Sequence, residues 1–503
     1  MNTTAILRFD KKESIGLVNS VDTGMSTAIV NDDLILSQLQ INQLLAVQSP
    51  KSGRFIIAMI VKINRKASNV EIEELDTFNS NDDMSSLALN QLKLVFVGEL
   101  IERSGSQRNI FRRNVSAVPS INAMCYRIDG ERLTNLMKSI SLRLAESILP
   151  LTLGKYTIDD NSIAYLDGDK FFQRHAAIVG STGSGKSYCV ARIVEQMAKL
   201  EHANAVLFDI HGEYSTEDFS QEGIIQLKVA APGDLKTPNK IDSNILMIPY
   251  WLLNYEEIQA LLLDRSDQNA PNQAMIFARQ ILGEKSRAVV GTQYDGLITV
   301  DSPVPYDLKM VLKELQRLDE ERIPGAKANT EKQGPFNGKL TRFNQRLQNK
   351  LDDKRLGFMF HLSEEELMQN WLLKFTSTLM DGTKGSIKVI NLSEVPSDIL
   401  PLVIGLLARI IFTMQQWSVS EKRHPIAMLC DEAHLYVQQN IQYDAVAEIG
   451  LKSFERLLWL LPQNRLRLQV RCLIHALVAC RMMPHYRYRH LQELEQSETR
   501  VRM

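Results

Sequence analysis

The residues with the clearest chemical meaning form the stretch GSTGSGKS, from Gly180 to Ser187, directly after the apolar run AAIV at 176–179. Two glycines five apart, followed at once by Lys186 and Ser187, have the spacing of a phosphate-binding loop between a strand and a helix. The glycines let the backbone turn tightly enough to direct several N–H groups at phosphate oxygens. The stretch therefore predicts a nucleotide-binding P-loop.

Two side chains of this loop have separate tasks. Lys186 is expected to neutralise the β and γ phosphates of ATP, and the Ser187 hydroxyl to ligate a Mg²⁺ ion. The apolar spacing that follows predicts a helix whose positive N-terminal end lies on the phosphates. The residues expected to contact the nucleotide are Gly180, Ser181, Thr182, Gly183, Ser184, Gly185, Lys186 and Ser187.

A pair of acids follows a second apolar run. Residues 426–430 read as a buried strand, and Asp431 and Glu432 stand at its end. This is the expected second half of a P-loop ATPase. We expect Asp431 to hold the Mg²⁺ ion through water and Glu432 to polarise the water that attacks the γ phosphate. His434 is expected to be structural, because nothing near it suggests a metal cluster.

A third polar group follows the apolar run 205–208. Polar residues at the carboxyl end of a strand line the ligand crevice of an open α/β sheet. Asp209 and Glu213 could therefore hold magnesium-bound water or orient the attacking water. Alternatively, they cap the next element. The residues alone leave both interpretations open.

Length and charge set limits on the class of protein. The 503 residues are too many for one core and predict two to four domains. The 58 basic and 59 acidic residues balance to a net charge of −1, so a nucleic-acid contact must be local. The five cysteines lack CxxC spacing, which argues against a zinc site and favours a reducing cytoplasm. No signal peptide or membrane segment is expected.

The chain order predicts a small β-barrel, an α/β core and a helical insertion. Short β segments separated by polar turns fill residues 1–125 and indicate the barrel. A helical connector is expected over 126–175. The ATPase core is expected over 176–214 and 386–460, and an inserted helical subdomain over 215–385. Residues 461–503 form a divergent, arginine-rich C-terminal segment.

The predicted insertion carries a basic stripe. One helical face is apolar, and its neighbouring face holds Lys339, Arg342, Arg346 and Lys350. Such a stripe can bind phosphate backbones, but it is more often a solvated face. Both interpretations stay open here.

Four stretches together resemble the HerA family of hexameric DNA-translocating ATPases. They are LDGDKFFQRHAAIVGSTGSGKS, FDIHGEY, IPYWLLNYEEI and LCDEAHLYV. The resemblance reaches to about residue 456 and includes the N-terminal barrel. It implies a RecA-like core of the additional-strand class, six subunits in a ring, ATP sites between subunits and duplex DNA in the central channel.

The same resemblance implies roles for single residues. It supports Lys186 and Ser187 at the nucleotide, and Asp431 and Glu432 for magnesium and water activation. It also indicates Arg174 as a residue that reaches the γ phosphate of a neighbouring subunit, which would couple hydrolysis to assembly. Alternatively, Arg174 only caps the strand or pairs with an acid.

The C-terminus departs from the family pattern. After Phe454–Glu455–Arg456 the expected Gly-Arg-Lys segment and Ser-Gln-Arg-Pro sensor do not follow. Residues 453–503 contain nine arginines but no lysine, glycine or aspartate. This break favours a reading-frame change or a truncated gene; the alternatives are a divergent tail that binds DNA or a partner, and chance bias in an amphipathic helix. A lost sensor strand would impair hydrolysis and expose apolar surface on the sheet.

The leading hypothesis is a ring-forming, ATP-dependent DNA translocase or helicase. The resemblance implies action beside a NurA-type nuclease or an antiphage-defence effector, either a sirtuin-type NADase or a nuclease. The alternative is a nucleotide-dependent ring scaffold that assembles and activates a partner enzyme, with weak or lost ATP turnover. A weaker third hypothesis is a secretion or conjugation ATPase.

Overall fold

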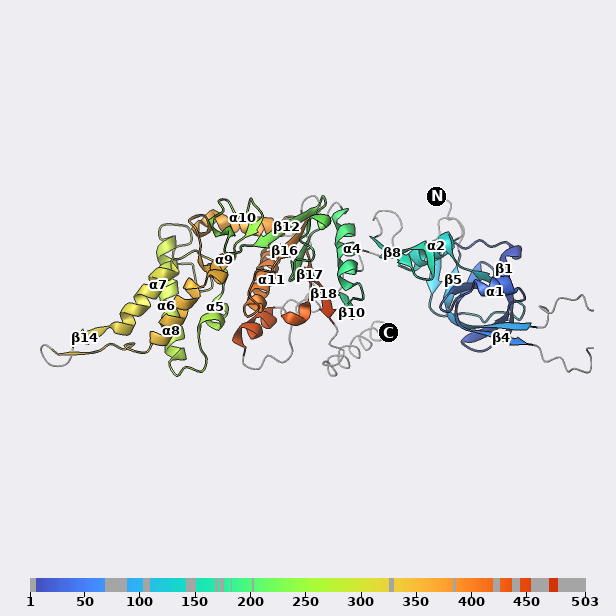
Figure 1. Cartoon of the computed structure of the whole chain (residues 1–503), viewed down its shortest axis with the longest axis horizontal. Helices are drawn as coiled ribbons and strands as arrows, with labels where there is room; N and C mark the ends of the chain where they lie inside the picture. The colour runs from blue at the N-terminus through green and yellow to red at the C-terminus, as the bar shows by residue number, and fades with distance from the viewer. Residues whose placement is uncertain are drawn as a thin grey trace, which may run out of the picture. The chain divides into compact units, whose positions relative to one another are not determined.

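A computed structural model shows two compact units, Met1–Lys170 and Phe171–Met503, which are described separately (Figure 1). The described residues are 6–67, 88–102, 109–141, 151–166, 168, 171, 176–181, 183–200, 203–324, 330–382, 386–418, 426–436, 444–453 and 470–477.

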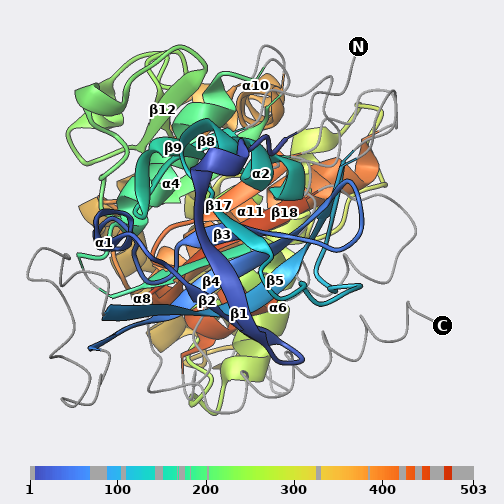
Figure 2. The ribbon, with the colours of Figure 1, turned by 90° about the vertical axis from the view of Figure 1, so that its right-hand side faces the viewer.

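The first unit contains a closed barrel. Its sheet has the order β2-β1-β7-β3-β4-β5-β6, and β2 also pairs with β5, so the strands close while β6 lies beside β5. Figure 2 shows β1, β3, β4 and β5 of this barrel. The strands are β1 (Ser14–Val21), β2 (Met25–Ile29), β3 (Leu44–Gln48), β4 (Arg54–Ala67), β5 (Ala88–Ile101), β6 (Ile110–Arg112) and β7 (Met124–Arg127).

The barrel forms because alternating apolar side chains meet in its interior. Val18, Ala28, Leu45 and Ile56 come from four different strands and belong to one buried cluster. Burial of such side chains is the main favourable term in folding. The N-terminal barrel expected from the sequence is confirmed.

Residues 126–175, which we expected to be a helical connector, contain a helix and a hairpin. The helix α2 (Gly130–Ser141) buries Leu133 and Leu136 in a cluster with barrel residues. The hairpin consists of β8 (Leu151–Tyr156) and β9 (Asp159–Leu166). The Ser162 hydroxyl donates a 2.8 Å hydrogen bond to the Gly130 carbonyl, which ties the hairpin to the start of α2.

The second unit is built on a parallel sheet with the order β10-β18-β17-β11-β16-β12-β13. The strands β11 and β17 are buried along their whole length, as expected for inner strands covered on both faces. In Figure 1 the sheet lies between α4 and α11. The strands are β10 (Ala176–Gly180), β11 (Ala205–Asp209), β12 (Ile224–Val229), β13 (Ile245–Leu246), β16 (Ile387–Asn391), β17 (Ile426–Cys430) and β18 (Val470–Leu477).

The strand β18 bears on the departing C-terminus. The loss of a central strand was the consequence that a truncated or frameshifted C-terminus would have had for the sheet. Instead, β18 pairs in parallel with both β10 and β17, so it separates the P-loop strand from the strand that precedes Asp431. The run VRCLIHAL is apolar enough at alternate positions to pair there, although its surrounding composition departs from the rest of the chain.

Helices cover the sheet and extend beyond one end of it. The helix α7 forms because Val311, Leu312, Leu315 and Leu318 recur every three or four residues and are all buried. The helices α6, α7 and α8 lie side by side in Figure 1. The helices are α4 (Lys186–Ala198), α5 (Tyr255–Leu262), α6 (Ala270–Val289), α7 (Leu308–Glu320), α8 (Thr341–Asp352), α9 (Gly357–Phe360), α10 (Gln369–Met380) and α11 (Leu400–Trp417), and a short hairpin joins β14 (Arg322–Pro324) and β15 (Glu331–Gln333).

The predicted insertion, residues 215–385, is not purely helical. Its first part supplies β12 and β13 to the main sheet, and the helices α5 to α10 follow. One buried cluster joins Phe208 of the sheet with Trp251, Phe343 and Phe375 of this region. The helices therefore share the core of the sheet.

The helix α11 is the one described helix that is long and apolar enough to cross a membrane. However, 67% of this 18-residue segment is buried within the unit. Its side chains join the cluster that covers the sheet. Its apolar composition is therefore that of a core helix.

Candidate functional site

The loop after β10 has the backbone conformation that its glycines predict. Gly183 and Gly185 have φ angles of +76° and +87°, in the left-handed region that favours glycine. A Cβ atom at Gly180 would collide with the Ser184 hydroxyl. Gly185 is the N-cap of α4, and no side chain caps its first turn. The free N–H groups and the positive end of the helix are therefore available to an anion.

Lys186 lies inside the loop. Its side chain is buried, and its ammonium group donates a 3.1 Å hydrogen bond to the Ser181 carbonyl. An ammonium held among backbone groups of this loop is placed for phosphate oxygens. The stretch predicted as a P-loop thus has a geometry that fits a nucleoside triphosphate. Thr182, which we also expected at the nucleotide, lies outside the described residues.

Asp209 caps the loop that follows β11. Its carboxylate accepts hydrogen bonds from the backbone N–H groups of Glu213 and Tyr214, both 3.0 Å long, and from the Ser215 hydroxyl at 2.8 Å. Burial raises the pKa of Asp209, and the nearby Asp431 carboxylate raises it further. Of the two roles left open for this residue, the structure favours the cap.

The acids after β17 lie at the same edge of the sheet. The Asp431 N–H donates a 3.4 Å hydrogen bond to the Phe208 carbonyl, and the Asp431 side chain is buried. Glu432 has φ +44° and ψ +42°, a left-handed conformation that is uncommon for a residue other than glycine. Backbone strain of this kind concentrates at functional sites.

Glu432 contacts the residue that we expected to be structural. A carboxylate oxygen of Glu432 lies 3.1 Å from Nδ1 of His434. The Glu432 side chain is largely buried, whereas His434 is partly exposed. His434 is therefore a direct neighbour of the Glu432 carboxylate. Among the described residues, no group of three or more metal-ligating side chains forms a cluster.

Tyr214, which the sequence reasoning gave no role, lies among these groups. Its side chain is 2% exposed. Burial raises its pKa, the Asp431 carboxylate raises it further, and the nearby Ser187 hydroxyl lowers it in part. Tyr214 thus has neighbours from both the P-loop and the end of β17. The signal that could have found it is its place in a polar turn directly after a buried strand.

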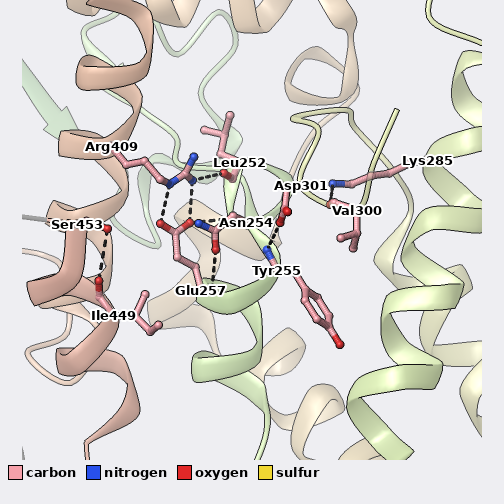
Figure 3. A network of polar contacts seen from close by, with 10 residues as sticks. All are labelled: Leu252, Asn254, Tyr255, Glu257, Lys285, Val300, Asp301, Arg409, Ile449 and Ser453. Carbon is pink, nitrogen blue, oxygen red and sulfur yellow. Dashed lines mark hydrogen bonds and ion pairs between the residues drawn. The ribbon is translucent and has the colours of Figure 1, made fainter. Parts of the chain in front are cut away.

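A second polar group that the sequence reasoning missed joins α5 to α11 (Figure 3). Arg409 donates two hydrogen bonds of 2.7 Å to the Glu257 carboxylate and one of 2.8 Å to the Leu252 carbonyl. Glu257 also completes a capping box with Asn254. A single arginine in an otherwise apolar helix was the available signal. This pair is structural, because its donors and acceptors are directed at one another.

The basic stripe, with three residues on α8 and Lys339 just before that helix, is partly engaged within the chain. Arg346 lies 3.0 Å from Asp264, and Lys339 donates a 2.8 Å hydrogen bond to the Pro335 carbonyl. Arg342 and Lys350 complete the stripe. The pKa of Asp267 is lowered mainly by hydrogen bonds from the Asn269 N–H and the Gln273 side chain, and in smaller part by Arg342. These contacts are typical of a solvated face. Arg174 lies outside the described residues.

Strand, loop and helix in this order, on a parallel sheet with a further strand between β10 and β17, define a P-loop ATPase. The profile of a family described as "Helicase HerA, central domain" matches residues 151–411, which is more than half of the 503 residues. The chain belongs to this HerA family.

Individual relatives agree with the profile. A probable helicase of Methanocaldococcus jannaschii is 25% identical over 207 residues, 37% of each chain. A probable DNA double-strand break repair helicase HerA of the same organism is 31% identical over 102 residues, 20% of this chain and 18% of that one. The DNA double-strand break repair helicase HerA of Saccharolobus solfataricus is 22% identical over 278 residues, 54% of this chain and 45% of that one. The matched parts span less than half of each relative.

Solved structures with a similar fold include VirB4 of Thermoanaerobacter pseudethanolicus. It is 12% identical, with a TM-score of 0.39 and coverage of 68% of this chain and 80% of that one. The plasmid coupling protein TrwB in complex with ADP and Mg²⁺ is 16% identical, with a TM-score of 0.34 and coverage of 68% and 70%. The family assignment does not depend on these distant similarities.

Proposed function

We propose that this protein is an ATP-dependent DNA translocase or helicase motor that works as a ring. The observation that carries the proposal is the convergence of the P-loop, the Asp209 loop and the end of β17 at one edge of a parallel sheet. The three curated relatives are named as helicases, two of them for DNA double-strand break repair.

In this proposal each polar residue of the site has one task. The N–H groups of the P-loop and Lys186 bind the phosphates. Ser187 and Asp431 would hold Mg²⁺, whose charge would offset the negative charge on the phosphoryl oxygens. Glu432 accepts the proton of the attacking water, and its contact with His434 orients it. Arg174 acts in trans on a neighbouring subunit's nucleotide.

The proposed assembly is a cytoplasmic homo-hexamer with duplex DNA in its channel. Its partner is a NurA-type nuclease or an antiphage-defence effector. In this arrangement the helices α5 to α10 form a subdomain inserted into the ATPase core. A ring would give a task to Arg174, two residues before the P-loop strand, because it would complete the site of the next subunit.

The test is ATP hydrolysis by the purified chain with and without duplex DNA, together with its mass by light scattering. The motor predicts turnover that duplex DNA stimulates, in a particle with the mass of six chains. Nucleotide binding in a ring that activates a partner enzyme, with no turnover on DNA, would contradict the motor and favour the scaffold.

A further inference from the structure

One buried hydroxyl at the site lacks a hydrogen bond. The Tyr214 side chain is 2% exposed, and its hydroxyl has no hydrogen-bond partner among the described residues. A buried polar group without a partner costs about 1 to 3 kcal/mol. Phenylalanine would fill nearly the same volume without this cost. Packing alone therefore does not explain why residue 214 is a tyrosine and not a phenylalanine.

The ring and backbone of Tyr214 are fixed independently of the hydroxyl. The N–H of Tyr214 donates a 3.0 Å hydrogen bond to Asp209, and its ring packs edge-on against Phe219 with centroids 5.8 Å apart. The Gln226 amide group donates a 3.5 Å hydrogen bond to the Tyr214 carbonyl. None of these contacts involves the phenol oxygen. The side chain is therefore held in place by contacts other than a hydrogen bond of its hydroxyl.

The groups around the phenol are those we assign to the metal. The Ser187 hydroxyl, at the start of α4, is a neighbour of the Tyr214 phenol, which nevertheless has no hydrogen-bond partner among the described residues. The Asp431 carboxylate is also near enough to add to the rise in the Tyr214 pKa that burial causes. The phenol O–H is a hydrogen-bond donor, and the Ser187 hydroxyl and Asp431 carboxylate oxygens can accept such a bond.

We propose that Tyr214 is a positioning residue for the magnesium side of the nucleotide site, and that its hydroxyl donates a hydrogen bond to the Ser187 oxygen when the metal nucleotide is bound. This inference rests on the proposed function. A hydroxyl that ligates a metal keeps a second lone pair, which can accept this bond. Neighbouring donors that orient metal ligands typically contribute 10- to 100-fold to metal affinity.

The test measures how much Mg²⁺ strengthens binding of a non-hydrolysable ATP analogue to the full chain. Binding is titrated in Mg²⁺ and in EDTA, and the ratio of the two affinities is the magnesium contribution. Tyr214→Phe should reduce this ratio by roughly 10-fold and leave the affinity in EDTA unchanged. Thermal unfolding without nucleotide should stay at the wild-type temperature or rise, because the variant removes an unsatisfied group.

Tyr250→Phe is the matched control. Tyr250 is also buried, but its hydroxyl donates a hydrogen bond to the Tyr306 carbonyl and accepts one from the Leu308 N–H at 3.2 Å. Its removal should lower the unfolding temperature and leave the magnesium contribution unchanged. A wild-type magnesium contribution in Tyr214→Phe would overturn the inference.

Ser187→Ala separates the inference from the proposed function. If Ser187 ligates the metal, this variant loses most of the magnesium contribution. A contribution that persists in Ser187→Ala would overturn the proposed metal site itself. Loss in Ser187→Ala combined with full retention in Tyr214→Phe would overturn only the role of Tyr214.

Discussion

The nucleotide edge of the sheet, formed by the P-loop, the Asp209 loop and the end of β17, differs from the Glu257–Arg409 pair in how completely its buried polar groups are hydrogen-bonded. At the pair, the Arg409 guanidinium donates two hydrogen bonds to the Glu257 carboxylate and a third to the Leu252 carbonyl. At the nucleotide edge, Glu432 has a left-handed backbone, and the Tyr214 hydroxyl has no hydrogen-bond partner in the part of the chain that the structure describes. Both regions lie within the second unit.

This difference distinguishes polar groups that stabilise the fold from polar groups that serve nucleotide binding or turnover. Saturated polar groups fix the position of α5 against α11, so disturbing them should change the free energy of unfolding. Strain and unused hydrogen-bonding capacity are tolerated where a ligand uses them. Disturbing the nucleotide edge should therefore change binding or turnover with little effect on folding.

The largest effect is expected for Glu432→Gln. The amide cannot accept the proton of the attacking water, so turnover should fall by about 10² to 10⁴-fold. ATP affinity and the unfolding temperature should stay near the wild-type values, because the variant keeps the size of the side chain. Steady-state hydrolysis and nucleotide titration measure the two effects. Normal turnover would remove Glu432 from the mechanism.

The next effect is expected for Arg409→Met. This variant leaves the buried Glu257 carboxylate without its partner, which typically costs about 3 to 5 kcal/mol of unfolding free energy. Denaturant unfolding measures the loss, while the affinity for ATP should not change. Glu256→Gln, at the neighbouring exposed acid, is the control and should change stability by less than about 0.5 kcal/mol. Equal stability of the two variants would show that the pair does not hold the helices together.

A smaller, pH-dependent effect is expected from Lys388. Its ammonium group donates hydrogen bonds to neutral acceptors, including the Asn204 side-chain oxygen at 2.8 Å, and burial lowers its pKa from 10.5 to about 8. Between these two pH values the unfolded chain binds more protons than the folded chain. Stability should therefore rise with pH over this window, by on the order of 3 kcal/mol.

Variants at two lysines isolate this effect. Lys388→Met should reduce the rise in unfolding free energy between pH 8 and 10.5 by about half, because one of two buried lysines whose pKa is lowered to about 8 is gone and Lys285 remains. Lys374→Met is the control, since Lys374 pairs with Asp242 at the surface. The rise should persist in the control. If both variants kept the same slope, the buried ammonium would not be its source.

Local sequence patterns predicted much of the fold. Short β segments do occur within residues 1–125, and the apolar runs 176–179, 205–208 and 426–430 all lie in strands. Each is a short apolar or alternating run bounded by polar turns, so its character is set locally. The P-loop was predictable for the same reason, because spacing alone determines its chemistry.

Long-range pairing explains most of what the sequence did not reveal. The strand β18 lies in a stretch of unusual composition. Only its pairing with β10 and β17 shows that this segment is an inner strand of the sheet. Asp209 could have capped its loop or faced the nucleotide, and only its three hydrogen bonds decide. The neighbours of Tyr214, which are Ser187 and Asp431, come from segments more than 200 residues apart in the chain. A local sequence pattern therefore cannot predict that they lie together.

The most direct test of the central claim, that ATP binds at the loop after β10, is a binding titration of wild type and Lys186→Ala with a fluorescent ATP analogue in Mg²⁺. We expect saturable binding by the wild type. In the variant we expect a loss of about 3 kcal/mol of binding free energy, or roughly 100-fold in affinity, because the ammonium contact with the phosphates disappears. Wild-type affinity in Lys186→Ala would contradict the claim and move the nucleotide to another part of the chain.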